Sequence, residues 1–180
     1  MKQRMIMNSK SEKKFVDDFI DKLNQLIRST NENLGEVLED PVPEITLKKK
    51  RSKDPLKDLV YSFSAKSIDF FDLTILNEIS SVPNGIAFGR HHGYSADIVK
   101  DQNNEIVLVT DGGSILFYSA KNLECFLRAH EIYIDYLIQD QNETKKFENE
   151  VVKQYKTNAA MAAGGMRYYK YYDSMFFTRS

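Results

Sequence analysis

Two adjacent histidines, His91 and His92, are the residues whose types and spacing best suit catalysis or metal binding. Imidazole nitrogens transfer protons near neutral pH and bind metal ions, and Asp97 lies near enough in the sequence to add a third polar group. Adjacent residues of a strand point to opposite faces of a sheet, so both rings can serve one site only if they lie in a turn. The sequence therefore favours a surface or turn role for the pair. It predicts no metal ion and no cofactor, and an enzyme that uses the loop of His91 and His92 is the least favoured alternative.

Other potential catalytic groups lack the context that their chemistry needs. The glycines in residues 89–93 and at residues 112–113 match neither a P-loop nor the dinucleotide-binding pattern, and they are typical of turns. No strand–turn–helix motif that would expose a nucleophile surrounds the candidate serines, Ser114, Ser119 and Ser174. The single cysteine, Cys125, cannot close an intrachain disulfide, and its apolar neighbours predict a buried core thiol. The sequence predicts a protein without catalytic residues.

The charge of the chain is unevenly distributed. Residues 45–66 contain seven basic and two acidic side chains, a formal charge of +5, whereas residues 69–111 contain two basic and seven acidic ones, a formal charge of −5. Such asymmetry is typical of a binding face for a charged partner, although two surfaces that neutralise each other would give the same pattern. We predict that four acidic side chains contact a basic partner, with a solvated rim of the sheet as the alternative: Asp97, Asp101, Glu105 and Asp111.

A basic run at residues 48–53 has the pattern of a nucleic-acid or nuclear-import patch. The run is short, and no aromatic side chain that could stack on a base is interleaved with it. We interpret it as a solvated loop and expect no nucleic-acid partner.

Length and composition limit the class of protein. A chain of 180 residues is long enough for one domain with a sizeable core, and 42% hydrophobic with 28% charged residues is ordinary for a globular protein. No apolar run is long enough to span a membrane, and residues 1–10 lack the apolar core of a secretory signal. We therefore expect a cytoplasmic protein that makes no membrane contact.

Helices are predicted on both sides of a strand-rich centre. Apolar residues recur every three or four positions over residues 11–28, which predicts an amphipathic helix. Prolines exclude a continuous helix over residues 36–58, where at most a short edge strand fits. Asp72 is a suitable cap for a short helix over residues 73–79, and Ser119 is a suitable cap for a longer helix with a buried apolar stripe.

Alternating apolar and polar residues predict strands between these helices. The near-continuous apolar run at residues 105–110 predicts a strand that is covered on both faces. The following Asp-Gly-Gly sequence at residues 111–113 can supply the positive φ angles of a hairpin turn. The expected strands form an antiparallel meander backed by helices, and they cover residues 59–63, 67–71, 86–88, 94–99, 105–110 and 114–118.

Aromatic residues crowd the C-terminal part of the sequence. Residues 143–157 permit a helix, and the glycines at 164 and 165 are expected to interrupt helical structure. The aromatic side chains that follow are Tyr168, Tyr169, Tyr171, Tyr172, Phe176 and Phe177. Leaving them in water is unfavourable by roughly 25 cal/mol per Å² of apolar surface. We expect them to pack on the sheet or against another chain, as in a structural or regulatory scaffold or a homo-oligomer.

Five segments in the centre of the chain carry a family resemblance. They are the GIAFG segment at residues 85–89, the turn at residues 90–93, the strand entry at residues 95–97, the strand at residues 105–109 and the helix start at residues 120–127. Together they resemble the SUKH superfamily, which includes immunity proteins of bacterial polymorphic toxin systems and a fungal regulator of cell-wall synthesis.

Members of this superfamily are α+β proteins with a twisted, mainly antiparallel sheet flanked by helices, and the resemblance implies that fold here. It also implies a non-enzymatic binding protein, most specifically an immunity protein that neutralises a toxin by direct binding. A nuclease toxin would suit the acidic side chains, because its own substrate is a polyanion. We predict a flexible N-terminus (residues 1–10), one SUKH-like domain (residues 11–140) and a helical, aromatic extension (residues 141–180).

Overall fold

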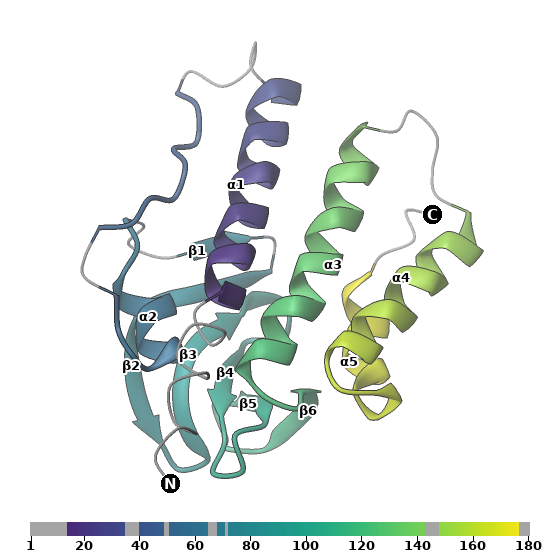
Figure 1. Cartoon of the computed structure of the whole chain (residues 1–180). Coiled ribbons are helices and arrows are strands. Elements are labelled where there is room, and N and C mark those ends of the chain that lie inside the picture. Colours follow the sequence, from purple (N-terminus) through teal and green to yellow (C-terminus); the bar gives the residue numbers. More distant parts are fainter. Residues whose placement is uncertain are drawn as a thin grey trace, which may run out of the picture.

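A six-stranded antiparallel sheet with helices over one side forms the centre of the protein (Figure 1). The computed structural model describes residues 14–34, 40–48, 51–64, 68–70, 72–142 and 148–176. The strands lie in sequence order, so the sheet is an open meander with β1 and β6 at its edges. They are β1 (Ile68–Phe70), β2 (Leu73–Val82), β3 (Gly85–His91), β4 (Ala96–Lys100), β5 (Ile106–Thr110) and β6 (Ile115–Ala120). The predicted α+β fold, a twisted antiparallel sheet flanked by helices, is confirmed.

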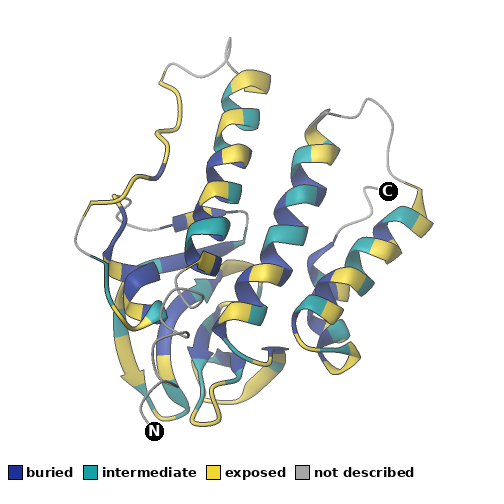
Figure 2. Cartoon of the chain, viewed as in Figure 1, coloured by how far each residue is buried: buried dark blue, intermediate teal, exposed yellow. Residues whose placement is uncertain are grey.

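Two long helices, α1 (Lys14–Leu34) and α3 (Leu123–Asn142), lie side by side above the sheet (Figure 1). The apolar stripe predicted for the first helix is buried, and the helix continues to Leu34, six residues beyond its predicted end at residue 28. The shorter helices are α2 (Pro55–Tyr61), α4 (Asn149–Ala162) and α5 (Tyr169–Met175). Figure 2 shows that buried residues gather where the helices meet the sheet.

The strand predicted at residues 59–63 is wrong, because most of this segment belongs to helix α2. Asp54 caps the helix by accepting a hydrogen bond from the backbone N–H of Leu56 at 2.9 Å. Pro55 occupies the first turn, where its missing N–H costs nothing. These two helix-starting residues precede the alternating apolar residues at 59–63, and the helix that they start continues through most of that segment. The segment before it, as expected, forms no continuous helix, and only the single bridge between Leu47 and Phe63 is strand-like.

The helix predicted at residues 73–79 is also wrong, since these residues form strand β2. Ile75 pairs with Ile68 of β1 on one side and with Gly89 of β3 on the other. A Cβ at Gly89 would lie 2.8 Å from the carbonyl oxygen of Thr74, so glycine permits this close approach of β3. Pairing on both edges thus outweighs the helical spacing of the apolar residues.

The remaining predicted strands are confirmed with small shifts of their ends. Tyr94, which was expected in a strand, lies instead in the short 3-10 turn between β3 and β4. The predicted helix cap at Ser119 is wrong, because this residue belongs to β6 and its hydroxyl donates to the carbonyl of Ile106 at 2.8 Å. Asn122 caps α3 instead, and its Oδ1 accepts from the N–H of Cys125 at 2.8 Å.

Strand β5 is buried on both faces, as predicted. Ile106 and Leu108 join the main core beneath the helices. On the opposite face, a second apolar cluster is formed by Ala87, Val99, Val107 and Val109. The curled sheet encloses this cluster, since the amide of Asn84 in the β2–β3 turn donates to the carbonyl of Gly113 in the β5–β6 turn at 3.0 Å.

The C-terminal aromatic segment completes the main core. Positive φ angles at Gly164 and Gly165 turn the chain back after α4. The phenol of Tyr172 then donates to the carbonyl of Ser119 on β6 at 3.0 Å. The expected packing of aromatic side chains is confirmed for Tyr168, Tyr171, Tyr172 and Phe176, while Phe177 lies outside the described residues. Residues on both sides of position 140 therefore share one core.

His130 on α3 lies at the centre of this aromatic packing. It is fully buried, and its ring centroid lies 4.1 Å from that of Phe126. Its Nδ1 lies 2.7 Å from the carbonyl oxygen of Phe126, and its Nε2 lies 3.4 Å from the hydroxyl of Tyr171. A neutral imidazole satisfies both contacts by donating to the carbonyl and accepting from the phenol. Burial lowers the pKa of His130 to about 4.

This buried imidazole predicts that the protein loses stability in mild acid. Between about pH 6.5 and 4 the unfolded chain binds a proton at His130 that the folded chain does not. Lowering the pH from 6.5 to 4 is therefore expected to lower the free energy of unfolding by about 3 kcal/mol. Urea unfolding across this range measures the slope. This slope reports the number of protons taken up on unfolding, and His130→Gln is expected to reduce that number by up to one. Equal slopes in the two proteins would contradict the assignment.

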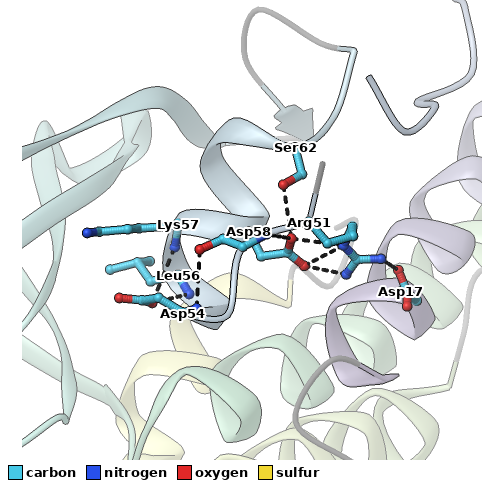
Figure 3. A network of polar contacts seen from close by, with 8 residues as sticks. Asp17, Arg51, Asp54, Leu56, Lys57, Asp58 and Ser62 are labelled. Atoms are coloured by element: carbon cyan, nitrogen blue, oxygen red, sulfur yellow. Dashed lines mark hydrogen bonds and ion pairs between the residues drawn. The ribbon is translucent and has the colours of Figure 1, made fainter. Parts of the chain in front are cut away.

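One side chain of the predicted basic run, Arg51, forms a structural ion pair. Figure 3 shows its guanidinium between Asp58 of α2 and Asp17 of α1. The Asp58 side chain is 1% exposed and also accepts from Ser62 Oγ at 2.9 Å and from the N–H of Ser52 at 2.8 Å. Burial alone would raise the pKa of Asp58, but these hydrogen bonds, led by that from Arg51, hold it below its ordinary value.

The two partners of Arg51 provide a matched comparison of buried and exposed ion pairs. Asp58→Asn is expected to lower the free energy of unfolding by about 3 kcal/mol, because it leaves the guanidinium without its buried counter-ion. Asp17, whose side chain is 47% exposed, is expected to cost less than about 1 kcal/mol when changed to Asn. Urea unfolding at neutral pH measures both, and similar losses would contradict this ranking. The contribution of Asp58 to the free energy of unfolding is fully present above the ordinary pKa of an aspartate and is lost below it. The contribution of the neutral His130 is lost earlier during acidification, between about pH 6.5 and 4.

Candidate functional site

The predicted contact residues Asp97 and Asp111 lie together and share one arginine. Asp97 on β4 is directly opposite Arg90 on β3 in the sheet. The Nη1 of Arg90 lies 2.8 Å from an oxygen of Asp97, and its Nη2 lies 3.2 Å from an oxygen of Asp111. Asp111 remains largely exposed, with 74% of its side chain accessible. The group therefore keeps one net negative charge at the tip of the β5–β6 hairpin.

The other two predicted contact residues, Asp101 and Glu105, lie at the opposite end of the β4–β5 hairpin. Asp101 closes the turn, because its Oδ1 accepts from the backbone N–H groups of Asn103 and Glu105 at 2.8 Å each. Glu105 accepts from the phenol of Tyr168 at 2.7 Å and pairs with Arg167 at 3.1 Å. Burial and this hydrogen bond raise the pKa of Tyr168 to about 12. The structure thus divides the four carboxylates into two pairs, and three of them have a basic partner.

An apolar surface on edge strand β6 lies between these two acidic pairs. We call it the β6 surface, and it consists of Ile115, Leu116 and Tyr118, each about two-fifths exposed. Ile115 pairs with Val109 and Tyr118 with Val107, so these two side chains extend the second apolar cluster to the edge of the sheet. The guanidinium of Arg167 lies 5.3 Å from the centre of the Tyr118 ring. Among the described strands, only β5 pairs with β6.

The adjacent histidines do not form one site. His92 is exposed, and its Nε2 lies 2.7 Å from the hydroxyl of Thr74. His91, at the end of β3, is only 3% exposed and packs against the ring of Tyr94 at a centroid distance of 4.7 Å. Neither ring nitrogen of His91 has a hydrogen-bond partner among the described residues. The predicted turn follows His91, and it separates the two rings.

His91 lines a cavity of about 220 Å³ between the end of the sheet and the helices. His91 is the last residue of β3, and Asp72 immediately precedes β2. The backbone N–H of His92 donates to the carbonyl of Asp72 at 2.6 Å, which fixes the two segments together. Desolvation by burial lowers the pKa of His91, although the nearby Asp72 charge opposes this shift. The cavity is lined by Asp72, His91, Gly93, Tyr94, Tyr133, Ser174 and Met175.

The cavity lacks the hydrogen bonds that would activate a nucleophile. A general base must reach the proton that it removes, and a third group normally orients that base. The hydroxyl of Ser174 donates to the carbonyl of Tyr171 at 2.5 Å, and His91 makes no hydrogen bond to it or to Asp72. The arrangement can bind and desolvate a small polar group, but it provides no assembled catalytic dyad.

The other features considered in the sequence, a reactive thiol, a metal site and a membrane span, can each be compared with the described residues. Cys125 is half-buried and packs against the core, where burial raises the pKa of its thiol. The described residues contain no group of three or more potential metal ligands from His, Cys, Asp and Glu. Within the same residues, no helix has both the length and the apolar character needed to cross a lipid bilayer.

No family model, curated protein or solved structure matches this chain. The SUKH resemblance of residues 85–127 therefore stays a prediction. The geometry of the β6 surface and of the His91 cavity carries the functional argument.

Sequence reasoning found His91 but missed most of the cavity around it. The sequence predicts a helix cap at Asp72, whereas the structure places this carboxylate in the cavity lining. Ser174 has no nucleophile motif around it, and no pattern in the sequence singles out Tyr133. The only usable signal was the closeness of His91, Gly93 and Tyr94 in the sequence, because the other described lining residues come from distant segments.

The buried, unpartnered imidazole predicts that His91 costs the folded protein stability. Replacing a buried polar group that makes no hydrogen bond with an apolar group of similar size removes its desolvation penalty. The substitution His91→Leu is therefore expected to leave the free energy of unfolding unchanged or to raise it by about 1 kcal/mol. Urea unfolding near pH 7.5 tests this, and a loss above about 1 kcal/mol would identify His91 as an architectural residue instead.

Proposed function

We propose that this chain is a non-enzymatic binding protein that neutralises a basic protein toxin by direct contact through the β6 surface. The observation that carries the proposal is the exposed apolar edge strand between two acidic pairs. A free edge offers unpaired backbone N–H and C=O groups to an extended segment of another protein. Exposed apolar side chains on such an edge are typical of an interaction site.

The outer edge of β6 is only partly covered by the chain itself. The carbonyl of Ser119 accepts from Tyr172, and the N–H of Lys121 donates to the carbonyl of Ala163. These contacts lie at the C-terminal end of β6, away from Ile115 and Leu116 at its beginning. An added strand would therefore meet the part of β6 nearest the hairpin tip.

Charge favours a basic partner for this part of the strand. Asp111 immediately precedes the hairpin tip, is largely exposed and shares Arg90 with Asp97. Asp101 adds a carboxylate in the β4–β5 turn, at the other end of strand β5. Complementary charge of this kind accelerates association and selects partners more than it adds affinity.

The SUKH resemblance supports an immunity protein, and the acidic flanks support a nuclease as the toxin, since a nuclease binds a polyanion through basic residues. A cytoplasmic site of action belongs to the same proposal. The scaffold alternative relied on exposed aromatic residues in the C-terminal segment, and burial of Tyr168, Tyr171, Tyr172 and Phe176 within the chain weakens it.

A charge introduced into the β6 surface is expected to abolish binding. The test begins with the genes beside this chain in its source genome, and the absence of a toxin gene among them would contradict the proposal. The toxin domain encoded there is then used, with binding measured by calorimetry and protection measured by growth on co-expression. Leu116→Arg is expected to weaken binding at least about 100-fold, because it places a desolvated like charge against a basic partner. The matched control is Leu34→Arg at the C-terminal end of α1, an apolar residue of similar exposure on an end of the helix that lies far from β6 (Figure 1), which is expected to leave affinity within about twofold.

The acidic flanks are tested separately with substitutions that keep the turn intact. Asp101→Ala would remove the acceptor that closes the β4–β5 turn, so Asp97→Asn and Asp111→Asn are preferred. These two changes together are expected to slow association and flatten its dependence on salt. Unchanged affinity in Leu116→Arg would reject the β6 surface, and an unchanged salt slope would reject the carboxylates as contacts.

A further inference from the structure

The cavity at the end of β3 has the features of a binding site that the β6 surface does not use. His91 is almost fully buried in its wall, and both ring nitrogens lack a hydrogen-bond partner among the described residues. A buried polar group without a partner is costly, and such groups recur at functional sites. Both nitrogens are themselves inaccessible to solvent, so the ring lines the cavity with its carbon edge, and Cε1 is the His91 atom that approaches the space at Gly93.

The charge of the lining is one-sided. Asp72 contributes a carboxylate, and none of the described residues that line the cavity is a lysine or an arginine. The aromatic side chains of Tyr94 and Tyr133 form part of the wall, and aromatic faces attract cations. The hydroxyl oxygen of Ser174, whose proton is donated to Tyr171, retains lone pairs that can accept.

We propose that this cavity binds a protonated primary amine, with the Asp72 carboxylate as its counter-ion and the aromatic side chains of Tyr94 and Tyr133 as walls that favour a cation. An alkylammonium group carries three donors and no acceptor. It therefore matches a site that offers the Asp72 carboxylate and the hydroxyl oxygen of Ser174. Burial keeps the pKa of His91 below its ordinary value, so the imidazole is neutral near pH 7.5.

Other ligand classes fit this lining less well. An anion would meet the like charge of Asp72, and the described part of the lining has no basic side chain to offset it. A transition metal ion would find only His91 and Asp72 of its preferred ligand types in the lining. A volume of about 220 Å³ is also below the roughly 300–1,000 Å³ typical of cofactor and drug-sized sites. A short alkyl chain with a terminal ammonium group is of suitable size.

Gly93 places the two polar groups around one point. A Cβ at this residue would lie 3.3 Å from Oδ2 of Asp72 and 3.4 Å from Cε1 of His91. The carboxylate and the imidazole thus approach the same small space, which the absence of a side chain leaves open. A methyl group there would narrow the space without requiring an unusual backbone conformation, since the φ of Gly93 is not positive.

The amine has two possible sources, a free small molecule and the side chain of a lysine in another protein. Both present the same alkylammonium group, so one pocket can serve either. The inference does not depend on the β6 surface, because it concerns different residues and is tested without a protein partner.

Titration of the isotope-labelled full chain, followed by NMR near pH 7.5, tests the inference with three probes. They are n-butylammonium chloride, its neutral analogue n-butanol, and Nα-acetyl-lysine methylamide. We expect n-butylammonium to shift the imidazole signals of His91 with a dissociation constant on the order of 1 mM, and n-butanol to bind at least about tenfold more weakly. Tighter binding of the lysine derivative identifies a protein side chain as the source, and tighter binding of n-butylammonium identifies a free amine.

Three substitutions separate the pocket from general effects. Asp72→Asn removes the charge at nearly constant volume and is expected to weaken n-butylammonium binding at least about tenfold. Gly93→Ala is expected to weaken it by narrowing the space, and it keeps the proposal testable if Asp72→Asn does not fold. The control is Glu124→Gln, an exposed carboxylate on α3 paired with Arg128, which is expected to change nothing. Equal binding of n-butanol and n-butylammonium, full affinity in Asp72→Asn and Gly93→Ala, or no binding of either amine would overturn the inference.

Discussion

One face of the sheet must be covered, and the chain draws the cover from both of its ends. Helix α1 supplies apolar side chains such as Phe19, whereas the C-terminal segment supplies Tyr171 and Tyr172. A large aromatic side chain buries at least about 150 Å², which is worth on the order of 4 kcal/mol before the entropy of ordering it. His130 joins the two contributions, because it lies on α3 between the tyrosines and Phe70 of β1. The fold depends on this aromatic layer more than on any single strand pairing.

The same layer gives the cavity its shape. Tyr133 comes from α3, Ser174 and Met175 come from α5, and Asp72 and His91 come from the sheet. The cavity exists because the C-terminal segment lies over the end of β3 instead of filling the space completely. The β6 surface has a different origin, since it remains where the same segment stops covering the edge strand. Both features are therefore products of how the core is closed.

Local patterns predicted much of this architecture. The amphipathic first helix, the four C-terminal strands and the glycine turns follow from spacing and turn chemistry that act within a few residues. The two elements whose type was wrongly predicted, at residues 59–63 and 73–79, are short segments that fit both a helical and an extended pattern. A cap decided the first case, and pairing on both edges decided the second. The site was harder to predict. Counting carboxylates along the chain could not show that Arg90 and Arg167 neutralise several of them, or that residues as distant as Asp72 and Ser174 line one cavity.

The late position of the tyrosine-rich helix in the chain imposes an order on biosynthesis. Strands β1 to β6 and α3 leave the ribosome before Tyr171 and Tyr172, which cover them. At about 5–20 residues per second, the growing chain exposes Phe126 and its apolar neighbours for seconds before the layer can close. Nascent chains that stall in α4 would therefore be substrates for chaperones and prone to aggregation, whereas chains whose residues up to Phe176 have left the ribosome can bury this surface.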